Sequence, residues 1–203
     1  MSKFKTYLPN ETGQDYICSD IHGHFSLLET HLEQVGFDKT KDRLFCLGDL
    51  IDRGDESSMA LNYLNKPWFY SILGNHELML IDAYEIDKDH VLQQWYQWGG
   101  AWAEDLSKED LEPFYEVMVV LPMAIELNLK SGEKVGLVHA ECPVDDWSTL
   151  QSLLASDCNE GVAARYDALW ARNIKEPLFD KAVDNIDLTV HGHTIFPQPI
   201  RRN

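Results

Sequence analysis

Five short apolar segments of this chain each end directly in a cluster of polar residues and glycine. The segments have the length and residue types of β-strands and cover residues 16–19, 44–47, 68–73, 135–138 and 188–190. The clusters that follow them are Asp20-Ile21-His22-Gly23, Gly48-Asp49-Leu50-Ile51-Asp52-Arg53-Gly54, Gly74-Asn75-His76-Glu77, His139-Ala140-Glu141 and His191-Gly192-His193-Thr194. In α/β sheets, ligands bind beyond the carboxyl ends of the strands. The pattern therefore predicts five polar clusters that can converge on one site.

Helical patterns separate these strand-like segments. Apolar residues recur at helical spacing over residues 25–35, 59–64, 77–83, 90–98 and 111–120, and the first of these patterns stops at Gly36. A further strand-like run over residues 124–129 can form an antiparallel hairpin with 135–138, turning at Ser131-Gly132. No linker-like stretch and no repeat divides the sequence. We therefore expect an α/β fold in a single domain over residues 1–203.

The composition excludes several classes of protein. Seventeen Lys and Arg against 34 Asp and Glu give a formal charge of −17, which argues against binding to nucleic acid phosphates. The apolar runs are shorter than the roughly 20 residues of a membrane span, and the N-terminus has no apolar signal core, so we expect a cytoplasmic protein without membrane contact. The four cysteines lack CxxC spacing, which favours free thiols over a redox or thiolate metal site.

The clusters contain carboxylates, imidazoles and one amide that can bind metal ions. These candidate ligands are Asp20, His22, Asp49, Asn75, His139 and His193. Oxygen and imidazole donors without thiolate select manganese, iron, zinc or magnesium. A carboxylate such as Asp49 can bridge two ions, and ions about 3.5–4 Å apart can hold an attacking hydroxide and a phosphoryl oxygen together.

Each cluster also has an ordinary structural explanation when it is taken alone. Asp-x-His can cap a helix, Asp-Arg can be a surface ion pair, and Gly-Asn can be a turn. However, six of the eight histidines fall in or beside the strand-end clusters, and only His31 and His90 lie elsewhere. The combination therefore favours a shared site over five unrelated features.

Together the clusters resemble the motifs of the PPP family of metal-dependent protein serine/threonine phosphatases, in its small bacterial and phage branch. The similarity extends from about Asp20 to Thr194, and the pair GDxxDRG and GNHE is its most specific part. The resemblance implies the calcineurin-like metallophosphoesterase sandwich of two mixed β-sheets flanked by helices. It also implies two divalent ions, manganese in the first place, with iron, zinc or magnesium as the other candidates.

The resemblance assigns a role to each matching residue. Asp20, His22 and the bridging Asp49 would bind the first ion, and Asp49, Asn75, His139 and His193 the second. The first ion then has three protein ligands, because Ile195 stands where related enzymes often have another His.

The same resemblance assigns the groups that act on the phosphate. Arg53 and Arg172 would hold the phosphoryl oxygens, with Asn75 as a further substrate contact, although a surface position is the alternative for Arg172. His76 would protonate the leaving group as the general acid, and Asp52 would orient its ring.

The sequence also departs from the family pattern. Ser19 replaces a glycine before Asp20, and the given sequence reaches Asn203 without the family's following strands. Trp95, Trp98 and Trp102 can line a substrate groove, although aromatic residues at helical spacing more often belong to a core.

The predicted function is hydrolysis of phosphoserine and phosphothreonine on proteins by direct attack of a metal-bound hydroxide, with phosphotyrosine left open. Phosphoprotein or phosphopeptide substrates are the expected partners. A diadenosine tetraphosphate hydrolase is the enzymatic alternative. A metal-binding interaction protein without turnover is the alternative from another class.

Overall fold

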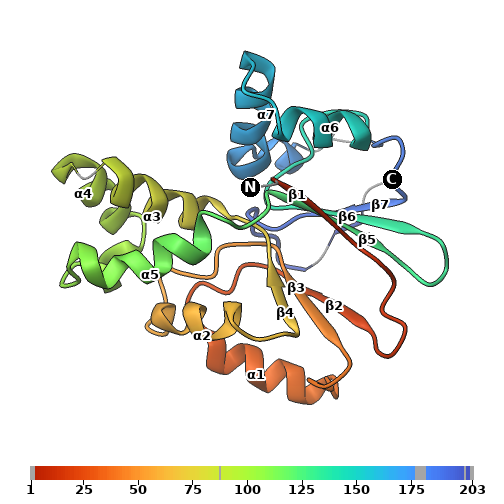
Figure 1. The fold of residues 1–203 in the computed structure, drawn as a ribbon, viewed down its shortest axis with the longest axis horizontal. Helices are drawn as coiled ribbons and strands as arrows, with labels where there is room; N and C mark the ends of the chain where they lie inside the picture. The colour runs from red at the N-terminus through yellow and green to blue at the C-terminus, as the bar shows by residue number, and fades with distance from the viewer. Residues whose placement is uncertain (1–2, 87, 177–181, 199, 202–203) are drawn as a thin grey trace. The chain divides into compact units, whose positions relative to one another are not determined.

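The computed structural model describes residues 3–86, 88–176, 182–198 and 200–201. The chain divides into two compact units, and each contains one β-sheet (Figure 1). Thr12–Leu121 form one unit, here called the parallel-sheet unit. Met1–Glu11 and Pro122–Asn203 form the other, here called the mixed-sheet unit. The single domain expected from the sequence stays a prediction.

The parallel-sheet unit has a three-stranded sheet in the order β2-β3-β4, and both pairs of strands are parallel. Its strands are β2 (Asp15–Cys18), β3 (Arg43–Cys46) and β4 (Phe69–Ser71). Its α-helices are α1 (Phe25–Gln34), α2 (Ala60–Leu64), α3 (Asn75–Ile86), α4 (Asp89–Gln97) and α5 (Lys108–Met118), with the 3₁₀-helices η1 (Ser57–Met59) and η2 (Gly100–Ala103). Because all three strands are parallel, the loops that follow them leave from the same edge of the sheet.

The mixed-sheet unit has four strands in the order β1-β5-β6-β7. They are β1 (Phe4–Tyr7), β5 (Ala124–Asn128), β6 (Lys134–Val138) and β7 (Leu188–Val190), and only the β5–β6 pair is antiparallel. The helices are α6 (Trp147–Leu154), α7 (Asn159–Trp170) and the 3₁₀-helix η3 (Asn173–Lys175). Trp147 of α6 packs its ring edge against Phe4 of β1, with ring centroids 5.6 Å apart, so α6 covers one face of this sheet.

The α/β class and most of the predicted elements are confirmed. The predicted hairpin is present, with β5 and β6 antiparallel and Gly132 in the turn at φ 91°. Helix α1 ends just before Gly36, which adopts φ 68° as a helix-terminating glycine. The sequence analysis did not identify β1, α6 or α7. A four-residue strand such as β1 carries little pattern of its own, and its partner β5 lies about 120 residues further along the chain.

Two expectations from composition can be compared with the structure. Within the described residues, no helix is both long and apolar enough to cross a membrane. All four cysteines lie in the described part of the chain, and none of them forms a disulfide.

Candidate metal centre and phosphate site

The loops after β2, β3 and β4 lie together in the parallel-sheet unit. The carbonyl oxygen of Asp49 accepts hydrogen bonds from the amides of Ile21 (2.9 Å) and His22 (2.8 Å), and the amide of Gly23 donates to Leu50 (2.9 Å). These backbone bonds join the loop after β2 to the loop after β3. Two of the five predicted strand-end clusters therefore lie together, and the convergence of all five stays a prediction.

Backbone strain is concentrated at the predicted site residues. Six non-glycine residues of the described chain have positive φ, and five of them are His22, Asp49, Asp52, Arg53 and His193. Such conformations cost of order 1–3 kcal/mol each and persist only where the surroundings impose them. The loops are therefore held in the geometry that presents these side chains.

Glu77 joins the loop after β3 to the loop after β4, and the sequence analysis gave it no role of its own. Its side chain is fully buried and accepts hydrogen bonds from the amides of Asp49 (2.8 Å), Leu50 (2.7 Å) and Gly74 (2.8 Å). Gly74 has no space for a side chain, because a Cβ there would lie 2.3 Å from the amide nitrogen of Asp49. The acidic residue that ends the GNHE motif was the available signal, since a buried carboxylate needs several donors.

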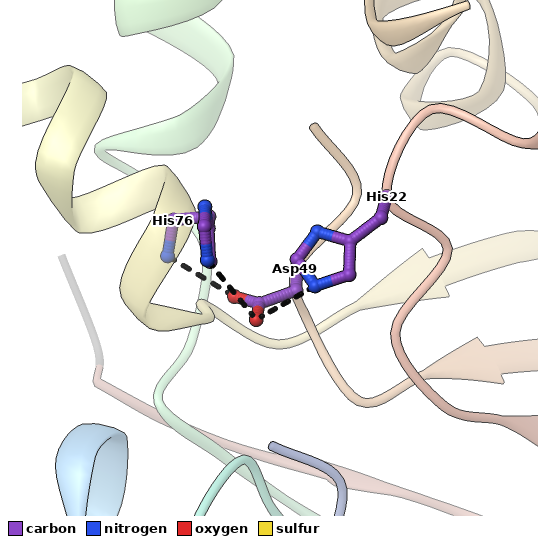
Figure 2. Close-up of side chains that lie close together, drawn as sticks. All are labelled: His22, Asp49 and His76. Atoms are coloured by element: carbon purple, nitrogen blue, oxygen red, sulfur yellow. Dashed lines mark hydrogen bonds and ion pairs between the residues drawn. The ribbon is translucent and has the colours of Figure 1, made fainter. Parts of the chain in front are cut away.

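His22, Asp49 and His76 form an acid–histidine group (Figure 2). One ligand atom from each of these three buried or nearly buried side chains lies within 4.8 Å of the others. Nε2 of His22 lies 3.5 Å from Oδ2 of Asp49, and Nε2 of His76 lies 4.0 Å from the same oxygen. The Asp49 carboxylate also accepts the backbone amide of His76 at 3.0 Å. Asp49 is therefore the centre of the group.

The hydrogen bond of His22 with Ile51 identifies which ring nitrogen has the lone pair. Nδ1 lies 3.0 Å from the carbonyl oxygen of Ile51, which can only accept, so Nδ1 carries the proton and Nε2 the lone pair. Burial lowers the pKa of His22, although the charge of Asp49 opposes this effect. A neutral imidazole with an oriented Nε2 beside a carboxylate is a suitable ligand for a divalent ion.

His76 pairs with Asp52 on the other side of the ring. Nδ1 of His76 donates to Oδ2 of Asp52 at 2.7 Å, and both side chains are buried. Burial alone would lower the pKa of His76, but the hydrogen bond with Asp52 and the charge of Asp49 outweigh burial, so this pKa is raised. Asp52 therefore orients the ring of His76, and the role of His76 as a general acid stays a prediction.

The guanidinium of Arg53 lies between the two imidazoles. Nη1 donates to Nε2 of His22 at 2.7 Å, and Nη2 donates to Nε2 of His76 at 3.0 Å. Arginine has donors only, so both Nε2 atoms act as acceptors here. A cationic fork at the centre of these histidines is suited to binding two oxygens of a phosphoryl group.

Two further predicted ligands of this unit, Asn75 and Asp20, are not among the three side chains of this group. Asn75 is buried and is the first residue of α3, directly before His76. Asp20 is half-buried and accepts the Ser19 hydroxyl at 2.7 Å. Both follow strand ends at the same sheet edge as Asp49.

The mixed-sheet unit brings its own predicted residues together. His139 and His193 follow the parallel strands β6 and β7, and their ring centroids are 5.0 Å apart. The amide of Gly192 donates to the carbonyl oxygen of His139 at 2.8 Å. Nη1 of Arg172 donates to the carbonyl oxygen of His193 at 3.3 Å, which places this arginine beside the histidine pair.

The chain belongs to the calcineurin-like phosphoesterase family, whose model matches residues 16–197. It is similar to bacterial serine/threonine-protein phosphatases. Serine/threonine-protein phosphatase 2 of Salmonella typhimurium is 38% identical over 135 residues, which are 65% of this chain and 60% of that protein. Serine/threonine-protein phosphatase 1 of the same organism is 32% identical over 192 residues, which are 92% of this chain and 79% of that protein.

A second group of relatives shares a shorter region. The symmetrical bis(5'-nucleosyl)-tetraphosphatase of Serratia proteamaculans is 41% identical over 71 residues, which are 34% of this chain and 25% of that protein. The match to the first phosphatase likewise spans less than two thirds of that relative's length. The family and its α/β fold agree with the resemblance seen in the sequence motifs.

Proposed function

We propose that this protein is a metal-dependent phosphomonoesterase that removes phosphate from phosphoserine and phosphothreonine in proteins, with phosphotyrosine as a further substrate class. The observation that carries the proposal is the Arg53 guanidinium lying within 3.0 Å of both His22 and His76, beside Asp49. Similarity to two bacterial serine/threonine-protein phosphatases supports the choice of phosphoprotein substrates.

The donor set of the parallel-sheet unit fits a divalent ion. Asp49 supplies carboxylate oxygens, His22 supplies an oriented lone pair, and no thiolate belongs to the acid–histidine group in the described chain. In our proposal, which follows the resemblance of the motifs, Asp20, His22 and Asp49 would hold the first ion. Asp49, Asn75, His139 and His193 would hold the second. When bound, the ions would supply an activated water and charge stabilisation, and manganese is the first metal to test.

The side chains around the ions act on the substrate. Arg53 binds two phosphoryl oxygens in this proposal. An ion on Nε2 of His22 would use the lone pair that accepts from Arg53 in this structure, so metal binding would already free Nη1, and the phosphate would draw Nη2 away from Nε2 of His76. The departure of Nη2 exposes Nε2 of His76, which can then take up a proton from solvent and pass it to the leaving oxygen while Nδ1 stays bonded to Asp52. Arg172 is the second phosphate contact in this proposal.

A substrate panel tests this function. The purified protein is assayed with manganese, magnesium, zinc or iron on matched phosphoserine and phosphotyrosine peptides, on diadenosine tetraphosphate and on p-nitrophenyl phosphate. We expect the highest kcat/KM on phosphopeptides. A preference for the dinucleotide would identify the enzyme as a tetraphosphate hydrolase, and metal binding without any turnover would identify an interaction protein.

A matched pair of variants makes the panel specific to the site. Asp49→Asn removes the central carboxylate, whereas Asp55→Asn neutralises an exposed carboxylate of the same loop. Asp49→Asn should abolish turnover and Asp55→Asn should retain it. Equal activity of both variants would contradict the proposed centre.

The metal ligands of the mixed-sheet unit need a separate test. His139→Ala should reduce the metal content from two ions per chain to one, measured by elemental analysis after gel filtration. We also propose a cytoplasmic location, in keeping with four cysteines that form no disulfide.

A further inference from the structure

The carboxylate of Asp52 is fully buried and has donors on both oxygens. Oδ2 accepts from Nδ1 of His76 at 2.7 Å and from Nε1 of Trp95 at 2.9 Å. Oδ1 accepts from Nε1 of Trp102 at 2.8 Å. Two indoles from a segment more than 40 residues away therefore hold the group that orients His76.

The same segment holds the neighbouring Arg53 by its backbone. The amide of Arg53 donates to the carbonyl oxygen of Gly99 at 2.9 Å. Gly99 has φ 124°, and a Cβ there would lie 2.9 Å from Cγ of Arg53. Asp52 and Arg53 have φ 74° and 70°, an unfavourable conformation for two consecutive residues with side chains. We call Trp95, Gly99 and Trp102 the indole clamp.

Both indole rings pack against other residues of this unit. Trp95 is 1% exposed, and a Cβ on Gly100 would lie 2.5 Å from its ring. Trp102 stands edge-on to Trp95, with centroids 6.2 Å apart, and contacts Phe114 at 5.2 Å. The core of this unit therefore sets the direction of the Trp95 N–H bond, and the half-buried Trp102 is held by its contacts with Trp95 and Phe114.

Neutral donors are the chemically suitable partners for this carboxylate. A buried carboxylate requires hydrogen bonds in place of water. A lysine or arginine would supply them but would also cancel the negative charge that acts on His76. Indole N–H groups stabilise the carboxylate through dipoles and add no positive charge, so the full charge of Asp52 remains available to the imidazole.

We propose that Trp95 and Trp102 are positioning residues that fix the Asp52 carboxylate for its hydrogen bond with His76, while Gly99 fixes the adjoining Arg53. The catalytic consequence rests on the proposed phosphatase function. The alternative is that the two tryptophans only fill the core. Core packing by itself does not direct both N–H groups to one carboxylate.

The first test is spectroscopic and independent of turnover. The protein is labelled with ¹⁵N at the indoles and studied in magnesium, which is diamagnetic. Asp52→Asn should move the indole N–H resonances of Trp95 and Trp102 upfield, because each loses a charged acceptor, and should leave those of Trp68 and Trp147 in place. Unmoved Trp95 and Trp102 resonances in the folded variant would overturn the proposal.

A second variant provides the same test if Asp52→Asn does not fold. Replacing Trp102 by β-(3-benzothienyl)alanine keeps the ring shape and exchanges the N–H for sulfur. This change should shift the Nδ1–H proton of His76, because Asp52 loses the donor on its other oxygen. An unchanged His76 resonance would show that Trp102 does not act through Asp52.

The kinetic test compares leaving groups. Alkyl phosphates need the general acid more than p-nitrophenyl phosphate does, since an alkoxide is the more basic leaving group. Trp102→Phe should lower kcat roughly 10-fold on a phosphoserine peptide and less than about 3-fold on p-nitrophenyl phosphate, a part of the 10²–10⁴-fold typical of general acids. Trp68→Phe is the control, because Trp68 is a buried tryptophan of the same unit away from Asp52.

The outcomes separate this proposal from the proposed function. A change of the leaving-group ratio in Trp102→Phe but not in Trp68→Phe supports positioning. Equal losses on both substrates would show that Trp102 only packs, and would overturn the proposal. A wild-type protein that hydrolyses neither substrate but shows the spectroscopic shifts would refute the phosphatase function and leave the indole clamp supported.

Discussion

Replacing Glu77 with glutamine tests whether one buried carboxylate holds the loops of the site. Oε2 of Glu77 accepts the amides of Asp49 and Gly74, each at 2.8 Å. Oε1 accepts the amide of Leu50 at 2.7 Å and, more weakly, that of Ile51 at 3.4 Å. Glutamine has almost the same shape but keeps only one of the two acceptor oxygens. Whichever way the side-chain amide turns, two backbone donors then face an NH₂ group.

The structure indicates the size of the effect. The better orientation keeps the oxygen on Asp49 and Gly74 and gives up one strong and one long bond, to Leu50 and Ile51. Hydrogen bonds to charged groups contribute about 1.5–3 kcal/mol each, and a buried donor without an acceptor adds its own cost. We therefore expect Glu77→Gln to lower the free energy of unfolding by about 2–4 kcal/mol.

Urea denaturation followed by tryptophan fluorescence measures this loss, and hydrogen exchange localises it. The amide of Leu50 should lose protection in Glu77→Gln. Glu85→Gln is the matched control on the same helix, because Glu85 is exposed and accepts only the Tyr115 hydroxyl in the described contacts. It should change stability by less than about 0.5 kcal/mol. A loss below about 1 kcal/mol in Glu77→Gln, with the Leu50 amide still protected, would refute the reasoning.

Four further predictions concern the proposed activity. Chelation should abolish turnover and manganese should restore it; full activity of protein shown by elemental analysis to be metal-free would contradict the metal mechanism. Asp49→Asn should lose more activity and metal than Asp20→Asn, because a bridging carboxylate serves two ions, and equal losses would argue against bridging. Arg53→Ala should lower kcat/KM at unchanged metal content, and a variant that loses its metals would show that Arg53 is no phosphate clamp. His76→Asn should reduce phosphoserine hydrolysis by about 10²–10⁴-fold and phosphotyrosine hydrolysis less, because a phenol with a pKa of about 10 leaves more easily without a proton than a serine alkoxide does. Assays on matched peptides measure the ratio of the two losses, and equal losses would show that His76 is not the general acid.

The positions of the site residues in the chain were predictable from the sequence. Apolar runs that end in Asp, His or Asn place those residues at strand ends, and β2, β3 and β4 do lead into Asp20, Asp49 and Asn75. Local periodicity and turn chemistry carry this information, because strand ends and glycine turns depend on neighbouring residues. The same local signal identified the β5–β6 hairpin.

The partners of these residues were decided by the tertiary structure. Asp52 precedes Trp95 by 43 positions and Trp102 by 50, so no sequence period relates them. The tryptophans appeared as groove or core residues in the sequence, and only the packing of α4 and η2 turned both N–H groups onto one carboxylate. Glu77 was visible in the sequence as part of a motif. Only the fold brings its two carboxylate oxygens to the backbone amides of two separate loops. Strand ends depend on neighbouring residues, so the sequence alone determined where the site residues stand in the chain. A hydrogen bond between distant residues depends on how the backbone brings donor and acceptor together, so only the tertiary structure decided these partners.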